Sequence, residues 1–400
     1  MFLPTAVYEI GNGAVIPIVA ITAVELGASP AMAGFLVALL GIGQLVGDIP
    51  SAALAAWLGD RRAMVVAGGI ATASMAVCVV ASSLLLLGVC LFVLGMCNAT
   101  FYLARQSYLT EVAPLALRAR AMSMLGGAHR IGLFIGPFVG AAVIGLTTVR
   151  AAYLVAVAAA AVATVLLIVI PDLEPTTGPM VRPATCPGRS GGFLGAAREH
   201  RRVLATLGFA VLGIGAARAA RQVVLPLWAV HIGLGPEATS VMFGIASAVD
   251  MALFYPAGKV MDRHGRLAVA VPSMLIMGLS MAVLPLSQEI IGLTAVAMVM
   301  SCGNGIGSGI VMTLGADVAP VDNRLRFISM WRLMNDTGNA AGPATVSVVA
   351  AVWTLAAGIL AVGTGALLAA VALAVWAPRY SPYATRAMMR ALRDAGRSGD

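Results

Sequence analysis

Charged side chains are rare in this chain, and several stand inside long apolar runs. Arg218 and Arg221 are three residues apart in the segment GIGAARAARQVVLPLW, so both lie on one face of a helix. Asp250 interrupts the next apolar run, and Glu9 interrupts the first. A guanidinium can bind an anionic group, and a carboxyl group in an apolar setting can take up and release a proton. These residues therefore predict anion binding and proton transfer.

Further polar side chains in the apolar runs complete the predicted site. A charge at the centre of a bilayer costs at least ~2.5 kcal/mol, so each one needs a reason. The candidates for proton coupling are Glu9, Asp250 and Asp336. The candidates for substrate binding are Arg105, Arg218, Arg221, Gln222, Asn12 and Asn304.

Two structural roles for these charges stay open. Opposite charges could pair and lock helices together, for example Asp250 with an arginine of 203–231. Arg105 stands about five residues from the end of its run, so its side chain could extend to the membrane surface instead. His129 is interpreted first as a packed or hydrogen-bonded histidine, and second as a proton relay.

The runs that carry these residues predict an integral membrane protein. The chain is 60% hydrophobic and 10% charged, with a mean hydropathy of +0.95, which no soluble domain of this size could bury. A helix needs roughly 20 apolar residues to cross the hydrocarbon core. Twelve runs of that kind occur, at 3–26, 31–57, 63–83, 85–110, 121–146, 150–170, 203–231, 236–261, 267–287, 289–316, 326–351 and 354–378.

The distribution of basic residues predicts the orientation. The net charge is +8, and 19 of the 25 basic residues fall on one side when the twelve runs are threaded through a membrane. Only Arg150 falls in a loop on the other side. Cytoplasmic loops carry such an excess, so both termini are predicted to be cytoplasmic, in the cytoplasmic (inner) membrane. The same location argues against a nucleic-acid partner.

The chain also contains an internal repeat. Residues 109–137 align without a gap with residues 315–343, and ten of these 29 pairs are identical. The loop at 49–63 matches the loop at 255–269 at the same offset of 206 residues. The expected domains are therefore two pseudo-symmetric six-helix bundles, 1–170 and 203–378, with a cytoplasmic linker at 171–202 and a cytoplasmic tail at 379–400. Duplicated halves of this kind build transport sites near the bilayer midplane.

The second loop resembles the signature loop of the major facilitator superfamily. The matching residues are Gly258, Asp262, Arg263, Gly265 and Arg266, whereas the first copy has Ala56 and Trp57 where the Asp and its Arg belong. The resemblance implies that this gating loop latches the cytoplasmic ends, with Glu111 and Asp317 as plausible partners. The alternative is a turn whose arginines only enforce topology.

A second motif is similar to one found in the drug–proton antiporters of that superfamily. It is the helix-5 Gly-Pro motif GLFIGPFVG, with Gly132, Gly136, Pro137 and Gly140. On helix packing alone these glycines predict close approach and a proline kink. The glycines of GNGIGSG, at 303–309, are interpreted in the same way because they lack the spacing of a phosphate loop.

Together these features predict a secondary active transporter that works by alternating access, and no enzyme. The only lysine, Lys259, lacks the context of a Walker loop, and the histidines lack the His-Glu-x-x-His spacing, so no metal or cofactor is expected. The resemblance favours a proton-coupled antiporter for efflux of drugs or amphiphilic metabolites. The alternative is a carrier for an anionic metabolite with an arginine-lined cavity. The expected partners are a small-molecule substrate, protons and the lipid bilayer, and the expected state is a monomer.

Overall fold

The fold is helical throughout the residues that the structure describes. The computed structural model describes residues 1–113, 118–170, 200–320 and 324–390, and no strand occurs among them. The predicted linker therefore lies outside the described residues, apart from its last three. The same holds for the last ten residues of the predicted tail.

The described chain divides into two compact units. Within the described residues, the first comprises 1–170 and 225–247, and the second comprises 200–224 and 248–390. The hairpin around 231–236 therefore packs with the first unit. A Cβ atom placed on Gly244 would lie 2.8 Å from the Phe138 ring, and one on Gly145 would lie 3.2 Å from the Glu237 carboxyl group.

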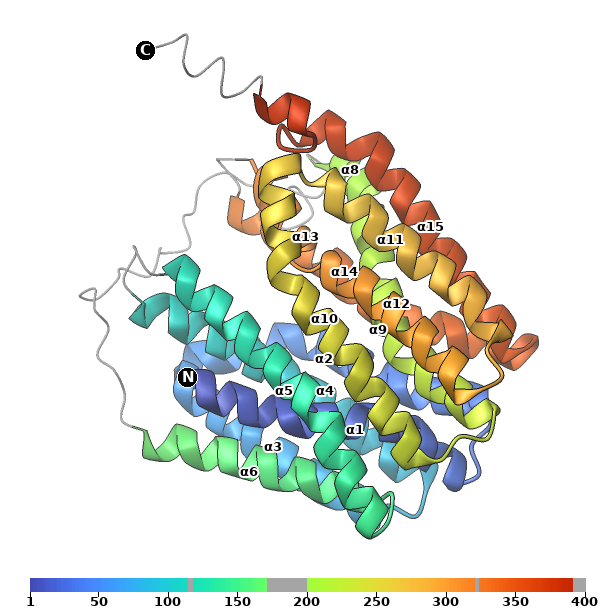
Figure 1. The fold of residues 1–400 in the computed structure, drawn as a ribbon. Helices are drawn as coiled ribbons and strands as arrows, with labels where there is room; N and C mark the ends of the chain where they lie inside the picture. The colour runs from blue at the N-terminus through green and yellow to red at the C-terminus, as the bar shows by residue number, and fades with distance from the viewer. Residues whose placement is uncertain (114–117, 171–199, 321–323, 391–400) are drawn as a thin grey trace. The chain divides into compact units, whose positions relative to one another are not determined.

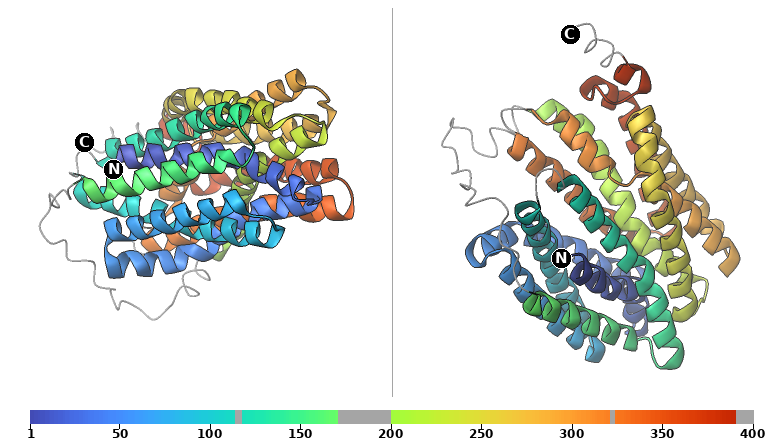
Figure 2. Two further views of the ribbon diagram at one scale, coloured as in Figure 1. Left: turned by 90° about the horizontal axis from the view of Figure 1, so that it is seen from below. Right: turned by 60° about the vertical axis from the view of Figure 1, so that its left-hand side comes forward.

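The first unit is built from six long helices (Figure 1). Helix α1 packs against α5 and α6, α2 packs against α4, and α3 packs against both α4 and α6 (Figure 2). These helices coincide with the long apolar runs of the sequence. Ser29 and Ser83 cap two of their N-termini by accepting hydrogen bonds from Met32 N and Leu86 N. The helices are α1 (Phe2–Glu25), α2 (Pro30–Leu58), α3 (Asp60–Val80), α4 (Leu84–Val112), α5 (Arg118–Leu146) and α6 (Ala151–Val169).

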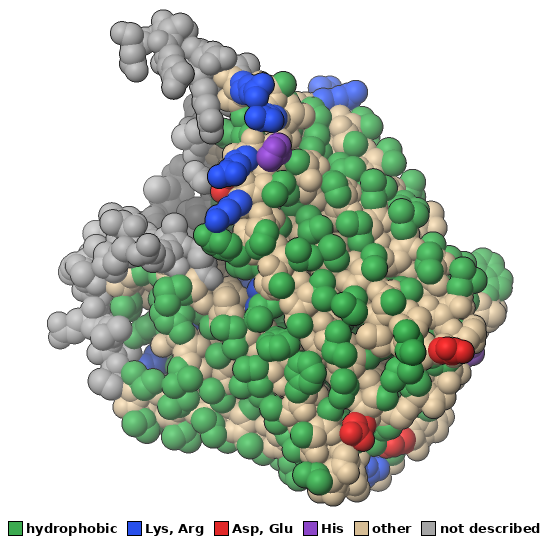
Figure 3. Space-filling model, in the orientation of Figure 1, with side chains coloured by type: hydrophobic (Ala, Val, Ile, Leu, Met, Phe, Trp, Pro, Cys, Tyr) green, Lys and Arg blue, Asp and Glu red, His purple; other side chains and the backbone are tan. Residues whose placement is uncertain are grey.

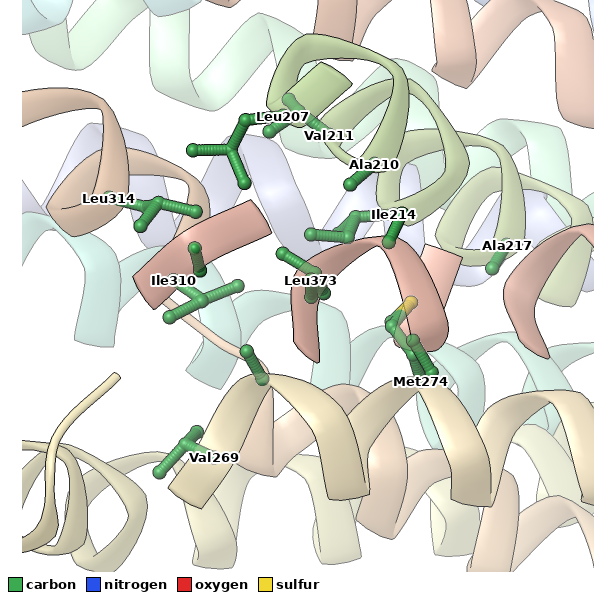
Figure 4. Close-up of a cluster of buried hydrophobic side chains, with 14 of the residues drawn as sticks. Leu207, Ala210, Val211, Ile214, Ala217, Val269, Met274, Ile310, Leu314 and Leu373 are labelled. Carbon is green, nitrogen blue, oxygen red and sulfur yellow. The ribbon is translucent and has the colours of Figure 1, made fainter. Parts of the chain in front are cut away.

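The second unit contains the remaining helices, except residues 225–247, which belong to the first unit. Helix α11 packs against α12 and α15, and α14 packs against α15. Apolar side chains from η2, α9, α11, α13 and α15 meet in one core, and Figure 4 shows Leu207, Ile214, Met274, Ile310 and Leu373 converging there. The elements are α8 (Arg201–Val203), η2 (Leu204–Gly208), α9 (Phe209–His231), α10 (Pro236–His264), α11 (Leu267–Val283), η3 (Leu284–Leu286), α12 (Ile290–Ile306), α13 (Ile310–Val318), α14 (Arg324–Val352) and α15 (Leu355–Tyr380).

Eleven helical segments in the described chain are long and apolar enough to cross a membrane. Many of their large hydrophobic side chains are exposed, and hydrophobic side chains are spread over the whole face drawn in Figure 3. Such a surface suits hydrocarbon as its solvent. The remaining predicted span, 326–351, coincides with α14 (Arg324–Val352), which is 29 residues long but carries polar residues such as Arg332, Asn335 and Asp336.

The internal repeat reappears in the helix contacts. In the first unit, a Cβ atom on Gly132 would lie 2.5 Å from the Ala6 carbonyl oxygen of α1. In the second unit, a Cβ atom on Gly338 would meet the Leu212 carbonyl oxygen of α9. Both pairs are related by 206 residues. The duplication found in the sequence therefore repeats the way in which the fifth predicted span of each half packs on the first.

The predicted span 289–316 is broken near its middle. Helix α12 ends at Ile306, and α13 starts at Ile310. Gly309 between them has a φ of +83°, a left-handed conformation that glycine adopts without steric strain. The GNGIGSG segment thus does more than the predicted close packing, because its last residues form a turn that interrupts the helix.

Candidate functional site

The most completely ligated charge in the first unit is the Glu9 carboxylate of α1. Its side chain has no exposed surface. Arg105 Nη1 of α4 donates to Glu9 Oε1 at 3.2 Å, and His129 Nδ1 of α5 lies 2.7 Å from the same oxygen. Asn12 Nδ2 and the Tyr102 hydroxyl donate to the second oxygen at 3.1 Å and 3.3 Å. We call these five residues the Glu9 cluster.

Spacing along three helices brings the Glu9 cluster together. Glu9 and Asn12 are three residues apart on α1, and Tyr102 and Arg105 are three apart on α4, so each pair shares a helix face. The Arg105 guanidinium also lies 4.4 Å from the centre of the Tyr102 ring. Burying a carboxylate is costly unless opposite charges and hydrogen bonds compensate it, and here all the donors named above converge on its two oxygens.

The Gly-Pro motif explains how His129 reaches Glu9. A Cβ atom on Gly136 would meet the Ile10 carbonyl oxygen, and one on Gly13 of α1 would lie 3.2 Å from Pro137 Cδ. Helices α1 and α5 thus approach at backbone distance, which only small residues allow. The motif in this way holds His129, about one turn before Gly132, against the carboxylate of α1.

In the second unit, the two arginines of α9 contact the broken helix. Arg218 donates to the carbonyl oxygen of Gly307, in the gap between α12 and α13. Arg221 Nη1 donates to Ser301 Oγ of α12 at 2.8 Å, and Arg221 is 6% exposed. The same carbonyl oxygen also accepts from Ile310 N at 3.2 Å, so Arg218 binds the turn that joins the two helices.

Asp250 of α10 lies against the same turn of α12. A Cβ atom on Gly305 would lie 3.0 Å from Asp250 Oδ1, and one on Gly307 would lie 3.2 Å from Arg218 Nη2. The absence of side chains at these two glycines makes room for both charged groups. Arg218, Arg221, Asp250 and Ser301 therefore form a second group, the α12 cluster, around residues 301–307.

Asp336 forms a smaller polar group on α14. Asn339 Nδ2 donates to its Oδ1 at 3.3 Å, and Arg332 Nε lies 3.5 Å from its Oδ2. These partners stand on the same helix, three and four residues away. Residues of the same helix thus compensate the cost of burying the Asp336 carboxylate. The arginine of this group is 40% exposed.

The gating loop joins three segments at the end of the second unit. Arg266 Nε donates to Asp317 Oδ2 of α13 at 2.9 Å, and the Ser381 hydroxyl donates to the same oxygen at 3.2 Å. Partial burial lowers the pKa of Arg266, but its hydrogen bonds with Asp317 outweigh burial and raise that pKa. Arg266 therefore keeps its positive charge at physiological pH.

Asp262 and the first copy of the loop do not make the contacts that Arg266 makes. Asp262 stands in the last turn of α10, not at a helix N-terminus, and its side chain is 76% exposed and 3.5 Å from Arg266. In the first unit, Arg61 donates to the carbonyl oxygens of Leu167 and Ile168 at the end of α6. The first copy of the loop, at 49–63, thus retains an arginine that caps the C-terminal end of a helix, where the helix dipole is negative.

Comparison with known families and structures shows which family the chain belongs to. The Major Facilitator Superfamily model matches residues 1–319 and 207–391. The chain belongs to this superfamily. No curated relative matches it in sequence. Its fold is similar to that of a D-xylose–proton symporter, with 14% identity, a TM-score of 0.71, and 96% of this chain and 97% of that chain covered.

Other solved transporters share the fold equally well. A POT family transporter, in complex with a thioalcohol-conjugated peptide, has 12% identity and a TM-score of 0.75, with 95% of each chain covered. The nucleoside transporter NupG, as a point mutant, has 14% identity and a TM-score of 0.71, with 95% of this chain and 97% of that chain covered. At these identities the likeness establishes the transporter fold and leaves the substrate open.

Several predicted site residues are brought together within a unit. Glu9, Asn12 and Arg105 meet in the Glu9 cluster, although they were predicted for two different roles. Arg218, Arg221 and Asp250 meet around α12. Gln222 and Asn304 are half-buried on α9 and α12. Asp336 joins neither group through a described contact and is compensated within α14.

Sequence reasoning missed two kinds of contributor. Tyr102 was not predicted, although its position three residues before Arg105 was a usable signal. Ser301 and the Gly307 carbonyl group were also not predicted, because an uncharged side chain and a broken helix leave little trace in a hydropathy pattern. His129 was predicted to be packed or hydrogen-bonded, and the structure places its Nδ1 2.7 Å from Glu9 Oε1.

Proposed function

We propose that the chain is a proton-coupled secondary active transporter, in which Glu9 binds and releases the proton. The observation that supports this role is the fully buried Glu9 carboxylate, shared by Arg105 and His129. A carboxylate held by an arginine and a histidine can exchange one of these partners for a proton when substrate or solvent arrives. A fold shared with a D-xylose–proton symporter is compatible with proton coupling and does not decide its direction.

The proposed direction is export, and the proposed substrates are drugs or amphiphilic metabolites. The support is the Gly-Pro motif of α5, which resembles that of drug–proton antiporters and holds α5 against α1. The transporter is proposed to work as a monomer in the cytoplasmic membrane. Its two halves are proposed to be 1–170 and 203–378, joined by the linker 171–202, and the gating loop at 258–266 is proposed to control access from the cytoplasm.

A carrier for an anionic metabolite is the second candidate. Arg218 and Arg221 favour it, because the described contacts of both include neutral acceptors, the Gly307 carbonyl oxygen and Ser301 Oγ. An anion could replace such neutral acceptors with a stronger, charge-assisted contact. In this alternative, Arg218→Ala would weaken binding of the anion without affecting amphiphilic cations.

A transport assay in proteoliposomes tests the proposal. We expect addition of a substrate from a panel of amphiphilic cations, neutral amphiphiles and organic anions to move protons, as reported by a trapped pH dye. Amphiphilic compounds that exchange against protons would support export. Organic anions that alone stabilise the protein and move would favour the second candidate. Substrate movement with no proton flux would contradict proton coupling.

The proposed orientation places both termini in the cytoplasm. It rests on the 19 basic residues on one side against Arg150 on the other. Thr148 and Arg62 are both exposed and fall on opposite sides. In a cysteine-free background, we expect an impermeant thiol reagent to label Thr148→Cys in intact cells and Arg62→Cys only after permeabilisation. The reverse pattern would show that the orientation is wrong.

A further inference from the structure

A basic pocket lies at the end of α10, outside the two buried clusters described above. Its volume is about 520 Å³, within the range of roughly 300–1,000 Å³ that small-molecule sites occupy. Three lining residues end α10, and three come from the helical segment 386–390. The lining residues are Asp262, Arg263, His264, Arg386, Met389 and Arg390.

Backbone contacts hold the two walls of this pocket together. After α15 the chain turns back, so that Arg266 N donates to the Tyr383 carbonyl oxygen at 3.1 Å and Leu267 N donates to the Ala384 carbonyl oxygen at 3.0 Å. Gly265 has a φ of +96°, and a Cβ atom there would lie 2.7 Å from the Ala384 carbonyl oxygen. Thr385 Oγ1 then accepts from Met388 N, at the start of the helical segment. The walls are thus part of the fold and need no ligand to form.

The lining carries an excess of positive charge. Asp262 is the one acid among the lining residues, and its carboxylate lies 3.5 Å from Arg266. Arg386 and Arg390 are four residues apart on a helix, where like charges repel each other. An anion between them would remove this repulsion. Figure 3 shows Lys, Arg and His side chains gathered near the C-terminal end of the described chain.

We infer that this pocket binds a phosphate group, carried either by an anionic phospholipid headgroup or by a soluble phosphorylated metabolite. Arginine forks match the oxygens of phosphate in geometry and charge. The pocket begins where a candidate membrane span ends, at His264. Headgroups of anionic lipids lie at that depth, and clustered basic residues recognise them.

The test uses the full chain in nanodiscs and measures the shift in unfolding temperature as ligand is added, because a ligand of the folded state stabilises it. One arm replaces part of the phosphatidylcholine with phosphatidylglycerol. The other arm keeps phosphatidylcholine and adds inorganic phosphate, against sodium chloride of equal ionic strength. The variant is Arg386→Gln/Arg390→Gln. The control, Arg62→Gln/Arg379→Gln, has the same net charge and alters exposed arginines that do not line the pocket.

We expect the wild type and the control to be stabilised in at least one arm, and the pocket variant to bind about 25-fold more weakly, since each basic residue near an anionic surface contributes about 1 kcal/mol. A response to phosphatidylglycerol alone assigns a lipid, and a response to phosphate alone assigns a soluble ligand. If the double variant is unfolded by circular dichroism, Arg263→Gln replaces it. Equal binding by variant and control, or no response of the wild type in either arm, would overturn the inference.

Discussion

The variant Glu9→Gln is expected to lose proton-driven accumulation of substrate while still exchanging substrate across the membrane. Glutamine keeps the size of the side chain but cannot take up a proton at that position. A gradient of one pH unit is equivalent to about 1.4 kcal/mol, or about tenfold accumulation per proton. In proteoliposomes with such a gradient we expect accumulation in the wild type and none in the variant. Exchange of labelled for unlabelled substrate needs no gradient and should continue.

Stability measurements separate this role from simple charge pairing. Removing one partner of a buried ion pair leaves the other charge uncompensated, at a cost of roughly 3–5 kcal/mol. If Glu9 only locks α1 to α4, the single variant should unfold at a lower temperature, and Glu9→Gln/Arg105→Gln should restore both folding and accumulation. Glu25→Gln, at an exposed acid on the same helix as Glu9, is the control. Undiminished proton-driven accumulation by folded Glu9→Gln would remove Glu9 from the coupling mechanism.

The variant Gly136→Ala is expected to damage the fold, whereas Gly127→Ala on the same helix is not. A Cβ atom at Gly136 meets backbone atoms of α1, including the Ile10 carbonyl oxygen, while one at Gly127 has nothing within 4 Å. Overpacking usually costs about 1–3 kcal/mol, and backbone atoms yield less than side chains do. Replacing an unconstrained helical glycine with alanine instead gains about 0.5–1 kcal/mol.

The comparison is made by the yield of folded protein and by unfolding temperature in detergent. We expect Gly136→Ala to unfold at a clearly lower temperature, and Gly127→Ala at the wild-type temperature or above it. Any Gly136→Ala protein that folds should also show weakened transport, because α5 positions His129 against Glu9. Equal unfolding temperatures for both variants would mean that α1 and α5 do not need the close approach seen in the structure.

Much of the helical framework could be predicted because one physical requirement dominates it. The predicted run 31–57 became α2 (Pro30–Leu58), since apolar length sets a span and the Ser29 cap with Pro30 sets its start. The 206-residue offset likewise predicted equivalent packing, and Gly132 and Gly338 make equivalent contacts. Family membership and membrane character were confirmed, whereas the antiporter branch and the domain boundaries stay predictions.

The details of the sites were harder to predict because they depend on helix rotation and on uncharged groups. Successive residues of a helix are about 100° apart around its axis, so the rotation of α5 decides whether His129 or Arg130 faces α1. A hydropathy pattern does not distinguish the two, because both residues are polar. The helix break at 307–309 could not be predicted, because it lies in an apolar run whose glycines are equally typical of close helix packing. Arg218 then binds a backbone carbonyl group, which no list of side chains could reveal.

The duplicated scaffold has one consequence for how the two halves divide their work. Shifted by 206 residues, Glu9 corresponds to Gly215, and His129 corresponds to Asn335. In the first unit those positions bring two side chains into contact. In the second, the backbones themselves meet, because a Cβ atom on Gly215 would collide with the Asn335 carbonyl oxygen. The position equivalent to Glu9 in the second repeat therefore has no room for a carboxylate side chain while these two backbones stay in contact.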